Sequence, residues 1–490
     1  MIVTRAGRRW RKGRLPVSDG KTAPLWTSRQ AMAATGGMLL GDTDWTATGI
    51  SIDTRTLEPG DLFVALKDVR DGHEFVSAAM EKGASACLVE RGDAGVEPAL
   101  QVKDVLDGLR MLGMAARDRS DAIRVAVTGS VGKTSVKEAI AAVFRAAGPA
   151  HWSVQSYNNH WGVPLTLARM PKQTERAVFE MGMNHAGEIR DLSALVRPHV
   201  ALITRIAPAH LENLGTIEAI ADAKSEIFEG LEQDGVAIYP SDDPLAERLA
   251  RHARHSCAAF MLDFGTGAAA AIRIEDFETG LDGSRGVANV LGVRAPFRLA
   301  ATGAHWAWNA GAIFAAAAGA GLDARDVAEA LSGVGAEAGR GRAITINLPG
   351  GGAFTLLDDA YNANPVSMAA AIAALGAAQP AAGGRRIAIL GDMLELGPDE
   401  NRLHAALADE LVAAGADAVI ACGRRMKHLH DALPNTVHTG YAQDAGEGLG
   451  QVKSIVKAGD VVLIKGSNGS GLHKIASVLV DGTAFGLTEA

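Results

Sequence analysis

The sequence lacks the features that mark secreted, membrane-spanning and general nucleic-acid-binding proteins. Its 490 residues include three cysteines, Cys87, Cys257 and Cys422, which lie far apart and without the spacing of a metal site. Such sparse cysteines indicate reduced thiols in a cytoplasmic protein. No apolar run approaches the roughly 20 residues that cross a bilayer. The formal net charge of −8 argues against a general nucleic-acid binder, which normally carries a basic field.

The N-terminal stretch differs in composition from the rest of the chain. "MIVTRAGRRWRKGRLPVSDGKT" is basic and has no apolar core, so it does not resemble a secretory signal. We interpret residues 1–24 as a disordered basic tail or an over-long start, with a nucleic-acid-binding arm as the alternative. Hydrophobic residues make up 48% of the chain, and its length suits about three domains with sizeable cores.

Strand and helix patterns alternate in three successive blocks. In residues 25–103, two short strands are expected around the Pro-Gly turn of "GISIDTRTLEPGDLFVALKD", followed by a helix and a strand in "FVSAAMEKGASACLVE". Residues 104–338 contain the buried strands "IRVAVT" and "VALIT". A small β-rich insertion is expected at 257–300 and an apolar helix at 305–321.

The third block, residues 339–490, contains the short strands "TLLDD", "IAIL", "AVIACG" and "VVLIKGS". Their alternation with helical stretches predicts a mostly parallel, Rossmann-like sheet. The polar segments "DDAYNANP", "GDMLE" and "KGSNGSG" follow strand ends, where such sheets bind ligands. The predicted fold is therefore α/β, with a small N-terminal domain, a central phosphate-loop domain with a parallel sheet, and a Rossmann-like C-terminal domain.

A phosphate-binding loop is predicted in "VAVTGSVGKTSVKEAI". Glycines let backbone N–H groups approach a phosphate, and the helix N-terminus adds positive potential. Lys133 supplies a point charge, and the Thr134 hydroxyl can ligate Mg²⁺. Val127 stands where the common pattern has glycine, so this loop is shorter. A plain tight turn would leave Lys133 and two successive hydroxyls unexplained. The loop candidates are Gly129, Ser130, Val131, Gly132, Lys133, Thr134 and Ser135.

Three further residues remain open on the sequence pattern alone. Glu180 follows an apolar stretch and precedes a glycine-rich turn, which suits either a metal carboxylate or a partnered glutamate at a strand end. His210 follows a strand and a proline turn, where histidine commonly caps or packs, and Mg²⁺ prefers oxygen ligands. Lys224 lies 14 residues after His210 on a predicted helix, and a lone lysine there is ordinarily solvated.

Several motifs in order over about residues 25–490 resemble the Mur ligase family: "TGSVGKTS", "YNNHWGVPLTLARM", "APAHLENLG", "GAHWAWNA", "AGRGR" and "LLDDAYNANPVSM". That family uses the short Gly-x-x-Gly-Lys-Thr loop. "DDAYNANP" and "DTRTLEPGDLFVAL" are similar to the members that add D-alanyl-D-alanine to UDP-N-acetylmuramoyl-tripeptide. The resemblance implies an ATP-dependent amide-bond ligase of peptidoglycan precursor synthesis, which forms an acyl phosphate and releases ADP and phosphate.

The resemblance also implies a role for each candidate residue. Lys133 would hold the β- and γ-phosphates and Thr134 a first Mg²⁺. Glu180, His210 and a carbamylated Lys224 would hold a second Mg²⁺ near the substrate carboxylate, because a carbamate turns a cation into an anionic oxygen ligand. The remaining implied contacts are Arg340 with the phosphates, His305 and Asn309 with adenine, Asp359 with ribose, Asn158 and Asn159 with the UDP-sugar-peptide, and Thr54 and Arg55 in the uridine-binding part. The implied catalytic set is Lys133, Lys224, His210 and Arg340.

Two positions depart from the family pattern. Trp306 replaces the first Asn of a common His-Asn-x-x-Asn motif, and Gly471 stands where arginine is often found. Lys465 and Ser467 remain candidates near the dipeptide. The resemblance implies a cytoplasmic monomer with ATP and Mg²⁺ as cofactors and only small molecules as partners. The alternatives are another Mur ligase, a folylpolyglutamate-synthetase-like ligase, and a nucleotide-driven switch without chemistry.

Overall fold

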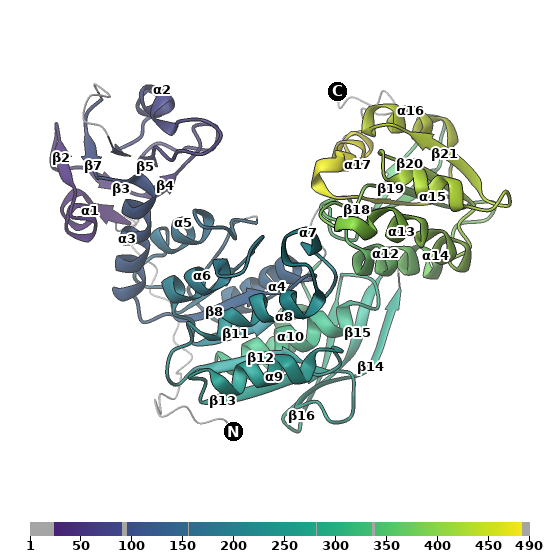
Figure 1. The fold of residues 1–490 in the computed structure, drawn as a ribbon, viewed down its shortest axis with the longest axis horizontal. Helices are drawn as coiled ribbons and strands as arrows, with labels where there is room; N and C mark the ends of the chain where they lie inside the picture. Colours follow the sequence, from purple (N-terminus) through teal and green to yellow (C-terminus); the bar gives the residue numbers. More distant parts are fainter. Residues whose placement is uncertain (1–23, 91–95, 155, 281, 336–338, 483–490) are drawn as a thin grey trace.

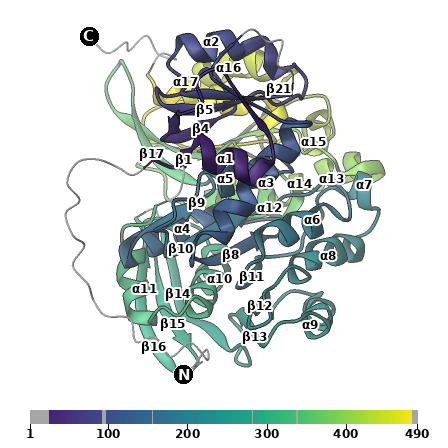
Figure 2. The same cartoon turned by 90° about the vertical axis from the view of Figure 1, so that its left-hand side faces the viewer.

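A computed structural model shows an α/β protein built on three main sheets, which confirms the predicted fold class. Each sheet and its helices form one unit, called here the first, central and third units. In Figure 1 the first unit (purple) and the third unit (green to yellow) lie at opposite ends of the long axis, with the central unit (teal) below and between them. Figure 2 gives the view along that axis. The described residues are 24–90, 96–154, 156–280, 282–335 and 339–482, so the predicted tail lies outside them except for Pro24.

The first unit contains a five-stranded sheet in the order β2-β7-β6-β5-β4. The strands expected around the Pro-Gly turn are β4 and β5, and they pair in parallel. Phe63 packs into one core cluster and Leu62 and Val64 into another, and burial on both faces is typical of parallel strands. The elements are β1 (Trp26–Thr27), α1 (Ser28–Thr35), β2 (Met38–Leu40), β3 (Thr46–Ala47), β4 (Gly49–Ser51), β5 (Asp61–Val64), η1 (Gly72–Phe75), α2 (Val76–Glu81), β6 (Ala86–Val89), β7 (Ala99–Gln101) and α3 (Val105–Asp118).

The central unit contains a nine-stranded sheet in the order β16-β15-β14-β13-β12-β11-β8-β10-β9. In strand β8, which lies between β11 and β10, Val125 and Val127 face one core cluster and Ala126 faces the other. Helices α4, α10 and α11 therefore cover one face, and α5, α6, α8 and α9 cover the opposite face. The strands are β8 (Ile123–Thr128), β9 (Ala150–Trp152), β10 (Arg176–Glu180), β11 (Val200–Ile203), β12 (Val236–Pro240), β13 (Phe260–Gly265), β14 (Ile272–Gly280), β15 (Gly283–Val290) and β16 (Val293–Leu299).

The residues expected as a small β-rich insertion form strands that extend this sheet. Strand β13 pairs in parallel with β12, and β14, β15 and β16 continue the same sheet. Alternating residues of these strands, such as Ile272 and Ile274, join the core under α10, which explains their alternating pattern. The helices of the unit are α4 (Lys133–Ala147), α5 (Gly162–Ala168), α6 (Glu188–Val196), α7 (Leu211–Leu214), α8 (Ile217–Ser225), η3 (Glu226–Phe228), α9 (Ala246–His255), α10 (Trp306–Gly319) and α11 (Ala324–Leu331).

The third unit contains a six-stranded sheet in the order β17-β18-β22-β19-β20-β21. The four predicted strands are present and pair in parallel, while β17 adds an antiparallel edge and β21 a further parallel one. The elements are β17 (Arg342–Asn347), β18 (Ala353–Asp359), α12 (Pro365–Ala377), β19 (Arg386–Gly391), η4 (Gly397–Asp399), α13 (Glu400–Ala405), α14 (Leu407–Ala413), β20 (Ala418–Cys422), α15 (Met426–Ala432), β21 (His438–Ala442), α16 (Ala445–Ile455), β22 (Val461–Lys465), η5 (Asn468–Ser470) and α17 (Leu472–Val480).

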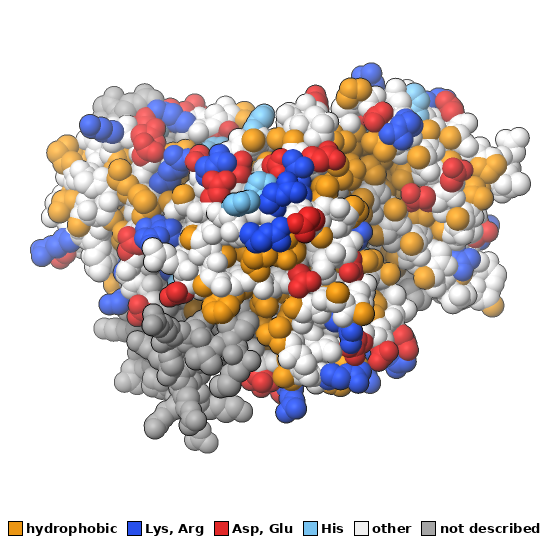
Figure 3. All heavy atoms as spheres, turned by 60° about the horizontal axis from the view of Figure 1, so that its bottom comes forward, with side chains coloured by type: hydrophobic (Ala, Val, Ile, Leu, Met, Phe, Trp, Pro, Cys, Tyr) orange, Lys and Arg blue, Asp and Glu red, His pale blue; other side chains and the backbone are white. Residues whose placement is uncertain are grey.

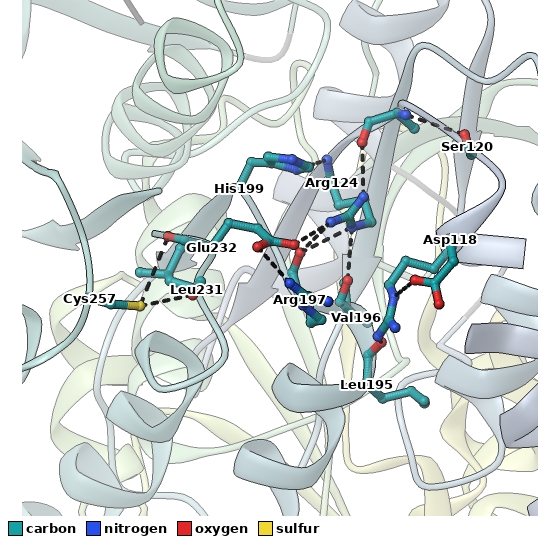
Figure 4. A network of polar contacts seen from close by, with 12 residues as sticks. Asp118, Ser120, Arg124, Leu195, Val196, Arg197, His199, Leu231, Glu232 and Cys257 are labelled. Atoms are coloured by element: carbon teal, nitrogen blue, oxygen red, sulfur yellow. Dashed lines mark hydrogen bonds and ion pairs between the residues drawn. The ribbon is translucent and has the colours of Figure 1, made fainter. Parts of the chain in front are cut away.

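A polar network closes the amino end of β8, at the edge of the sheet opposite the phosphate loop (Figure 4). The buried Arg124 guanidinium donates to the carbonyls of Val196 and Arg197 and to Glu232 Oε1, at 2.9, 2.8 and 3.0 Å. The backbone N–H of Arg124 donates to Nδ1 of His199 at 3.1 Å. Burial lowers the pKa of Arg124 to about 10. This network ties β8 to the start of β11 and so fixes the strands that carry the site at their other end.

The outer surface carries charges of both signs. Figure 3 shows acidic and basic side chains intermingled on one face, without a large field of one sign. Ion pairs of this surface include Arg248 with Asp222 and Arg254 with Glu247. No helix among the described residues combines the length and apolarity needed to cross a lipid bilayer.

Candidate active site

The predicted phosphate loop connects the carboxyl end of β8 to the first turn of α4. Gly132 adopts φ +81 at the N-cap of α4, and Gly129 adopts φ +151. A Cβ on Gly129 would lie 2.0 Å from Thr204 Oγ1, and one on Gly132 would lie 2.7 Å from Asn309 Oδ1. Both positions therefore require glycine for conformation and for space. The loop leaves the backbone N–H groups of the helix start free of a side-chain cap, as an anion site requires.

Lys133 is the first residue of α4, and its ammonium folds back over the loop. Its Nζ donates to the Gly129 carbonyl at 2.7 Å. Burial lowers the pKa of Lys133; the Glu180 carboxylate opposes this shift, and the Arg340 guanidinium adds to it. Charges from two units of the protein therefore act on the same ammonium.

Glu180 joins two predicted residues at the carboxyl end of β10. The Thr134 hydroxyl donates to Glu180 Oε2 and Asn158 Nδ2 donates to Glu180 Oε1, both at 2.8 Å. Glu180 is 1% exposed. A hydroxyl and a carboxylate side by side are the oxygen donors that Mg²⁺ prefers, with one or two carboxylates and phosphate oxygens completing its shell. No cluster of three or more His, Cys, Asp or Glu residues suited to a metal occurs in the described part of the chain.

The third unit contributes Arg340, Asp359 and Lys465 to the same region. Lys465 Nζ donates to Asp359 Oδ2 at 2.7 Å and to the Asn362 carbonyl at 2.9 Å. Burial raises the pKa of Asp359, while the Lys465 ammonium opposes the rise. The Arg340 guanidinium lies over the Tyr361 ring, 4.0 Å from its centroid. Asp359 is therefore already paired with Lys465, a partner not assigned to it from the sequence.

A cavity of about 800 Å³ brings these residues together between the central and third units. On its far wall, burial and the Lys465 charge lower the pKa of His305 to about 4, and His305 Nδ1 has no hydrogen-bond partner among the described residues. The predicted residues that line the cavity are Ser130, Val131, Gly132, Lys133, Thr134, Ser135, Asn158, Glu180, His305, Asn309, Arg340 and Asp359.

Lys224 and His210 lie outside the cavity lining. Lys224 is 1% exposed, on α8, so it is not the solvated lysine that its position suggested. Burial lowers the pKa of Lys224 well below its usual range, and the charge of Lys133 lowers it further. His210 adopts φ +59, and its Nδ1 lies 2.5 Å from Glu395 Oε2 of the third unit. That contact is an ion-pair distance without standard hydrogen-bond geometry at Nδ1.

The predicted substrate residues of the first unit and of the loop before α5 are more dispersed. Arg55 is exposed and pairs with Asp53 at 2.6 Å, next to Thr54. Asn159 Oδ1 accepts from the backbone N–H of Gly162 at 2.9 Å and so supports the start of α5. Asn158 alone of the four lies on the cavity. Substrate contacts of Thr54, Arg55 and Asn159 stay predictions.

The structure adds residues that the sequence did not single out. The Thr204 hydroxyl donates to the Val131 carbonyl at 2.6 Å, and the guanidinium of Arg205 lies 4.6 Å from the Trp308 ring centroid. Thr204 follows the end of β11, which is a neighbour of β8, so its place at a strand end was the available signal. Trp306, the departure from the family motif, is 2% exposed in the core, as befits a position without a ligand contact. The added cavity residues include Ser156, Thr204, Arg205, Trp308 and Tyr361.

The fold and site define a class: multidomain α/β proteins that bind a phosphorylated ligand on a glycine loop between two units. Two family models match the chain, the Mur ligase middle domain over residues 127–317 and the Mur ligase glutamate ligase domain over residues 339–468. The chain belongs to the Mur ligase family.

Individual relatives are similar over nearly the whole chain. UDP-N-acetylmuramoyl-tripeptide--D-alanyl-D-alanine ligase of Bacillus subtilis is 35% identical over 445 residues, which cover 88% of this chain and 93% of that protein. The Escherichia coli enzyme of the same name is 35% identical, covering 89% and 94%. A crystal structure of MurF from Acinetobacter baumannii superposes with a TM-score of 0.81 at 29% identity, covering 94% of this chain and 99% of that one.

Proposed function

We propose that this protein joins D-alanyl-D-alanine to UDP-N-acetylmuramoyl-tripeptide in an ATP-dependent reaction that releases ADP and phosphate. The carrying observation is the cavity in which Lys133 and Thr134 of the central unit face Arg340 and Asp359 of the third unit. The names of the relatives at 35% identity support the choice of substrates. Within the family, the match to these relatives over about nine-tenths of the chain favours this ligase over other members.

The chemistry requires a strongly positive site. A substrate carboxylate must attack the γ-phosphate of ATP, and both groups are anionic and repel. Lys133 and Arg340 supply two cations from opposite walls, which suits stabilisation of charge on a transferring phosphoryl group. The backbone N–H groups at the start of α4 bind the phosphates of the nucleotide. His305 and Asn309 would face the adenine, and Asp359 the ribose.

The residues present fit Mg²⁺ as the partner of the nucleotide. Thr134 and Glu180 place a hydroxyl and a carboxylate oxygen within 2.8 Å of each other, beside the phosphate loop. Thr134 would hold one ion and Glu180, with His210, a second. Bound Mg²⁺ would neutralise charge on the phosphate oxygens and on the carboxylate.

A carbamylated Lys224 would join Glu180 and His210 as a ligand of the second Mg²⁺. The reaction needs a neutral amine, which attacks carbon dioxide to form the carbamate and loses one proton. Burial lowers the pKa of Lys224 well below its usual range, which favours the neutral amine. The carbamate then places an anionic oxygen near Lys133 in place of a second cation.

The organisation of the protein follows from this function. We assign residues 25–103 to a UDP-sugar-binding domain that includes Thr54 and Arg55, residues 104–338 to an ATP-binding domain, and residues 339–490 to a Rossmann-like domain. The sparse cysteines support action in the cytoplasm, and the resemblance to the family supports a monomer.

A product assay tests the function directly. The protein is incubated with ATP, Mg²⁺, UDP-N-acetylmuramoyl-tripeptide and D-alanyl-D-alanine, and the molecular mass of the product is measured by mass spectrometry. We expect the mass of the joined pentapeptide and phosphate release that depends on both substrates. Phosphate release without them would support a nucleotide-driven switch, and a product only with glutamate or another amino acid would support a different ligase.

A further inference from the structure

Tyr361, in the loop after β18, forms a three-residue cluster with Arg340 and Ser156. The Tyr361 hydroxyl donates to Ser156 Oγ at 2.6 Å. The Arg340 guanidinium lies over the face of the Tyr361 ring, 4.0 Å from its centroid, and Arg340 Nη2 lies 3.4 Å from Ser156 Oγ. A guanidinium over a tyrosine face gains cation–π attraction. Tyr361 and Arg340 belong to the third unit and Ser156 to the central unit, so the cluster bridges the cavity.

The backbone fixes Tyr361 and Arg340 relative to each other. The N–H of Gly339 donates to Asp358 Oδ2 at 2.8 Å, and the N–H of Tyr361 donates to the Gly339 carbonyl at 3.0 Å. Gly339 adopts φ +74, and a Cβ there would lie 3.2 Å from the Tyr361 Cβ. The chain enters the third unit here, so the segment that carries Arg340 is held against the end of β18.

Ser156 connects the cluster to the phosphate loop. It lies two residues before Asn158, whose backbone N–H donates to the Ser156 carbonyl at 2.8 Å. The Asn158 side chain donates to Glu180, which accepts from Thr134. The Tyr361 hydroxyl is therefore connected to the first turn of α4 by a chain of contacts. The chain runs through the loop from Ser156 to Asn158 and through the Glu180 carboxylate.

We propose that Tyr361 is a positioning residue for Arg340 in the ligation reaction, an inference that rests on the proposed function. The ring holds the guanidinium plane, and the hydroxyl fixes the ring to the central unit. An arginine side chain has many rotamers, and a ring on one side together with Ser156 at its edge selects among them. Arg340 is thereby aimed at the phosphates when Tyr361 and Ser156 are in contact, and less well when they are apart.

Three substitutions separate the two contacts. Tyr361→Phe and Ser156→Ala each remove the hydroxyl contact and keep the ring, and we expect each to lower kcat by about 2- to 10-fold. Ser156→Ala also removes the contact with Arg340 Nη2. The double variant should therefore be no slower than Ser156→Ala alone, in which the bond between Tyr361 and Ser156 is already absent. Tyr361→Leu removes the ring as well, and we expect a loss of about 10- to 100-fold in kcat with an unchanged KM for D-alanyl-D-alanine.

The second test compares the effect of Tyr361→Leu in the wild-type protein with its effect in a protein that already carries Arg340→Ala. Titration calorimetry measures the affinity for a non-hydrolysable ATP analogue, a readout that needs no ligation. Tyr361→Leu should weaken this affinity in the wild-type background and leave it unchanged in the Arg340→Ala background, since a positioning residue acts only through its partner. An equal loss in both backgrounds would overturn the inference, and so would a Tyr361→Leu variant with wild-type kcat.

A matched control comes from the same unit. Tyr441 has its ring centroid 6.0 Å from Lys427 Nζ and lies away from the cavity, so Tyr441→Leu should keep wild-type kcat and analogue affinity. If Tyr361→Leu fails to fold, the test is the double variant of Tyr361→Phe and Ser156→Ala. Losses in kcat that add in the double variant would show that the two residues share no bond, and would overturn the inference. A wild-type protein that forms no product would overturn the proposed function, while the analogue affinities would still report on Tyr361.

Discussion

Glu395 of the third unit meets His210 of the central unit, with Oε2 of the glutamate 2.5 Å from Nδ1 of the histidine. Both residues adopt positive φ, +62 for Glu395 and +59 for His210, in a region that few residues other than glycine occupy. Helix α7, which starts after His210, also contacts η4 just after Glu395. A carboxylate beside one ring nitrogen orients the ring and leaves the other nitrogen, Nε2, available to a metal.

We predict that Glu395→Ala raises the Mg²⁺ concentration needed for half-maximal ligation by about 10-fold or more, because His210 loses the group that orients it. Thermal stability should change little, since both side chains of this contact are partly exposed and exposed charged contacts contribute about 0–1 kcal/mol. Mg²⁺ titrations of activity and melting curves measure the two effects. Glu400→Ala, which removes the ion-pair partner of Arg425 in the same unit, is the control, and an unchanged Mg²⁺ requirement in Glu395→Ala would contradict the prediction.

Lys133→Ala should abolish ligation while leaving the fold intact. In the proposed reaction the Lys133 ammonium supplies the point charge on the transferring phosphoryl group, and loss of one such group at a preorganised site costs about 10²- to 10³-fold in kcat. Steady-state phosphate release in the presence of both substrates measures the loss, and circular dichroism checks the fold. Near-normal turnover in a folded variant would remove Lys133 from the active site.

Local patterns in the sequence were sufficient to locate the elements that carry the site. The strand "IRVAVT", the glycine loop and the apolar helix at 305–321 correspond to β8, its loop and α10. Each prediction rests on the residues of one short segment: periodicity for β8 and α10, and glycine, lysine and hydroxyl types for the loop. The polar residues after β18 also lie on the cavity, because parallel strands deliver their carboxyl ends to one edge of the sheet.

Such local patterns do not predict contacts between segments that are distant in the sequence. The parallel pairing of β4 with β5, the joining of β14 to the central sheet, and the contacts of Glu395 with His210 and Tyr361 with Ser156 all depend on how separate segments meet. Burial of Lys224 is a different case, because it lies four residues after Ile220 on the helix face that joins the core. The spacing pointed to burial there, whereas the residue type favoured a solvated lysine.

The pH dependence of stability should have a component from His199. Its pKa is lowered from 6.5 to about 4, chiefly by burial and then by the charge of Arg124, and its Nδ1 must stay unprotonated to accept from the Arg124 N–H. The folded state thus binds fewer protons than the unfolded state between these values, so stability is complete above pH 6.5 and falls as the pH drops toward 4. From pH 7 to pH 5 we expect a loss of about 1–2 kcal/mol in the free energy of unfolding.

The variant His199→Asn isolates this component, because the Asn oxygen replaces Nδ1 as an acceptor without titrating. Urea unfolding at pH 7 and pH 5 should show a smaller difference in the variant than in the wild type. A part of the difference should persist, since burial also lowers the pKa of His151 to about 4. Equal pH dependence in the two proteins would show that His199 does not titrate in this range.

Carbamylation of Lys224 is open to a chemical rescue experiment. The Lys224 side chain is buried and makes no hydrogen bond or ion pair within the part of the chain that the structure describes, while its neighbour Glu226 accepts from the backbone N–H groups of Gly187 and Arg190. An ammonium here would repel Lys133, and at 4 Å with an effective dielectric of 20 a unit-charge pair is worth about 4 kcal/mol. A carbamate reverses the sign of that interaction.

Lys224→Ala should therefore lose about 100-fold or more in activity, and formate or acetate should restore part of it by returning an anionic oxygen to the site. Lys172→Ala, at an exposed position, should behave as wild type with or without these anions. Full activity in Lys224→Ala would exclude a role for the residue, and inactivity without rescue would mean that Lys224 acts unmodified.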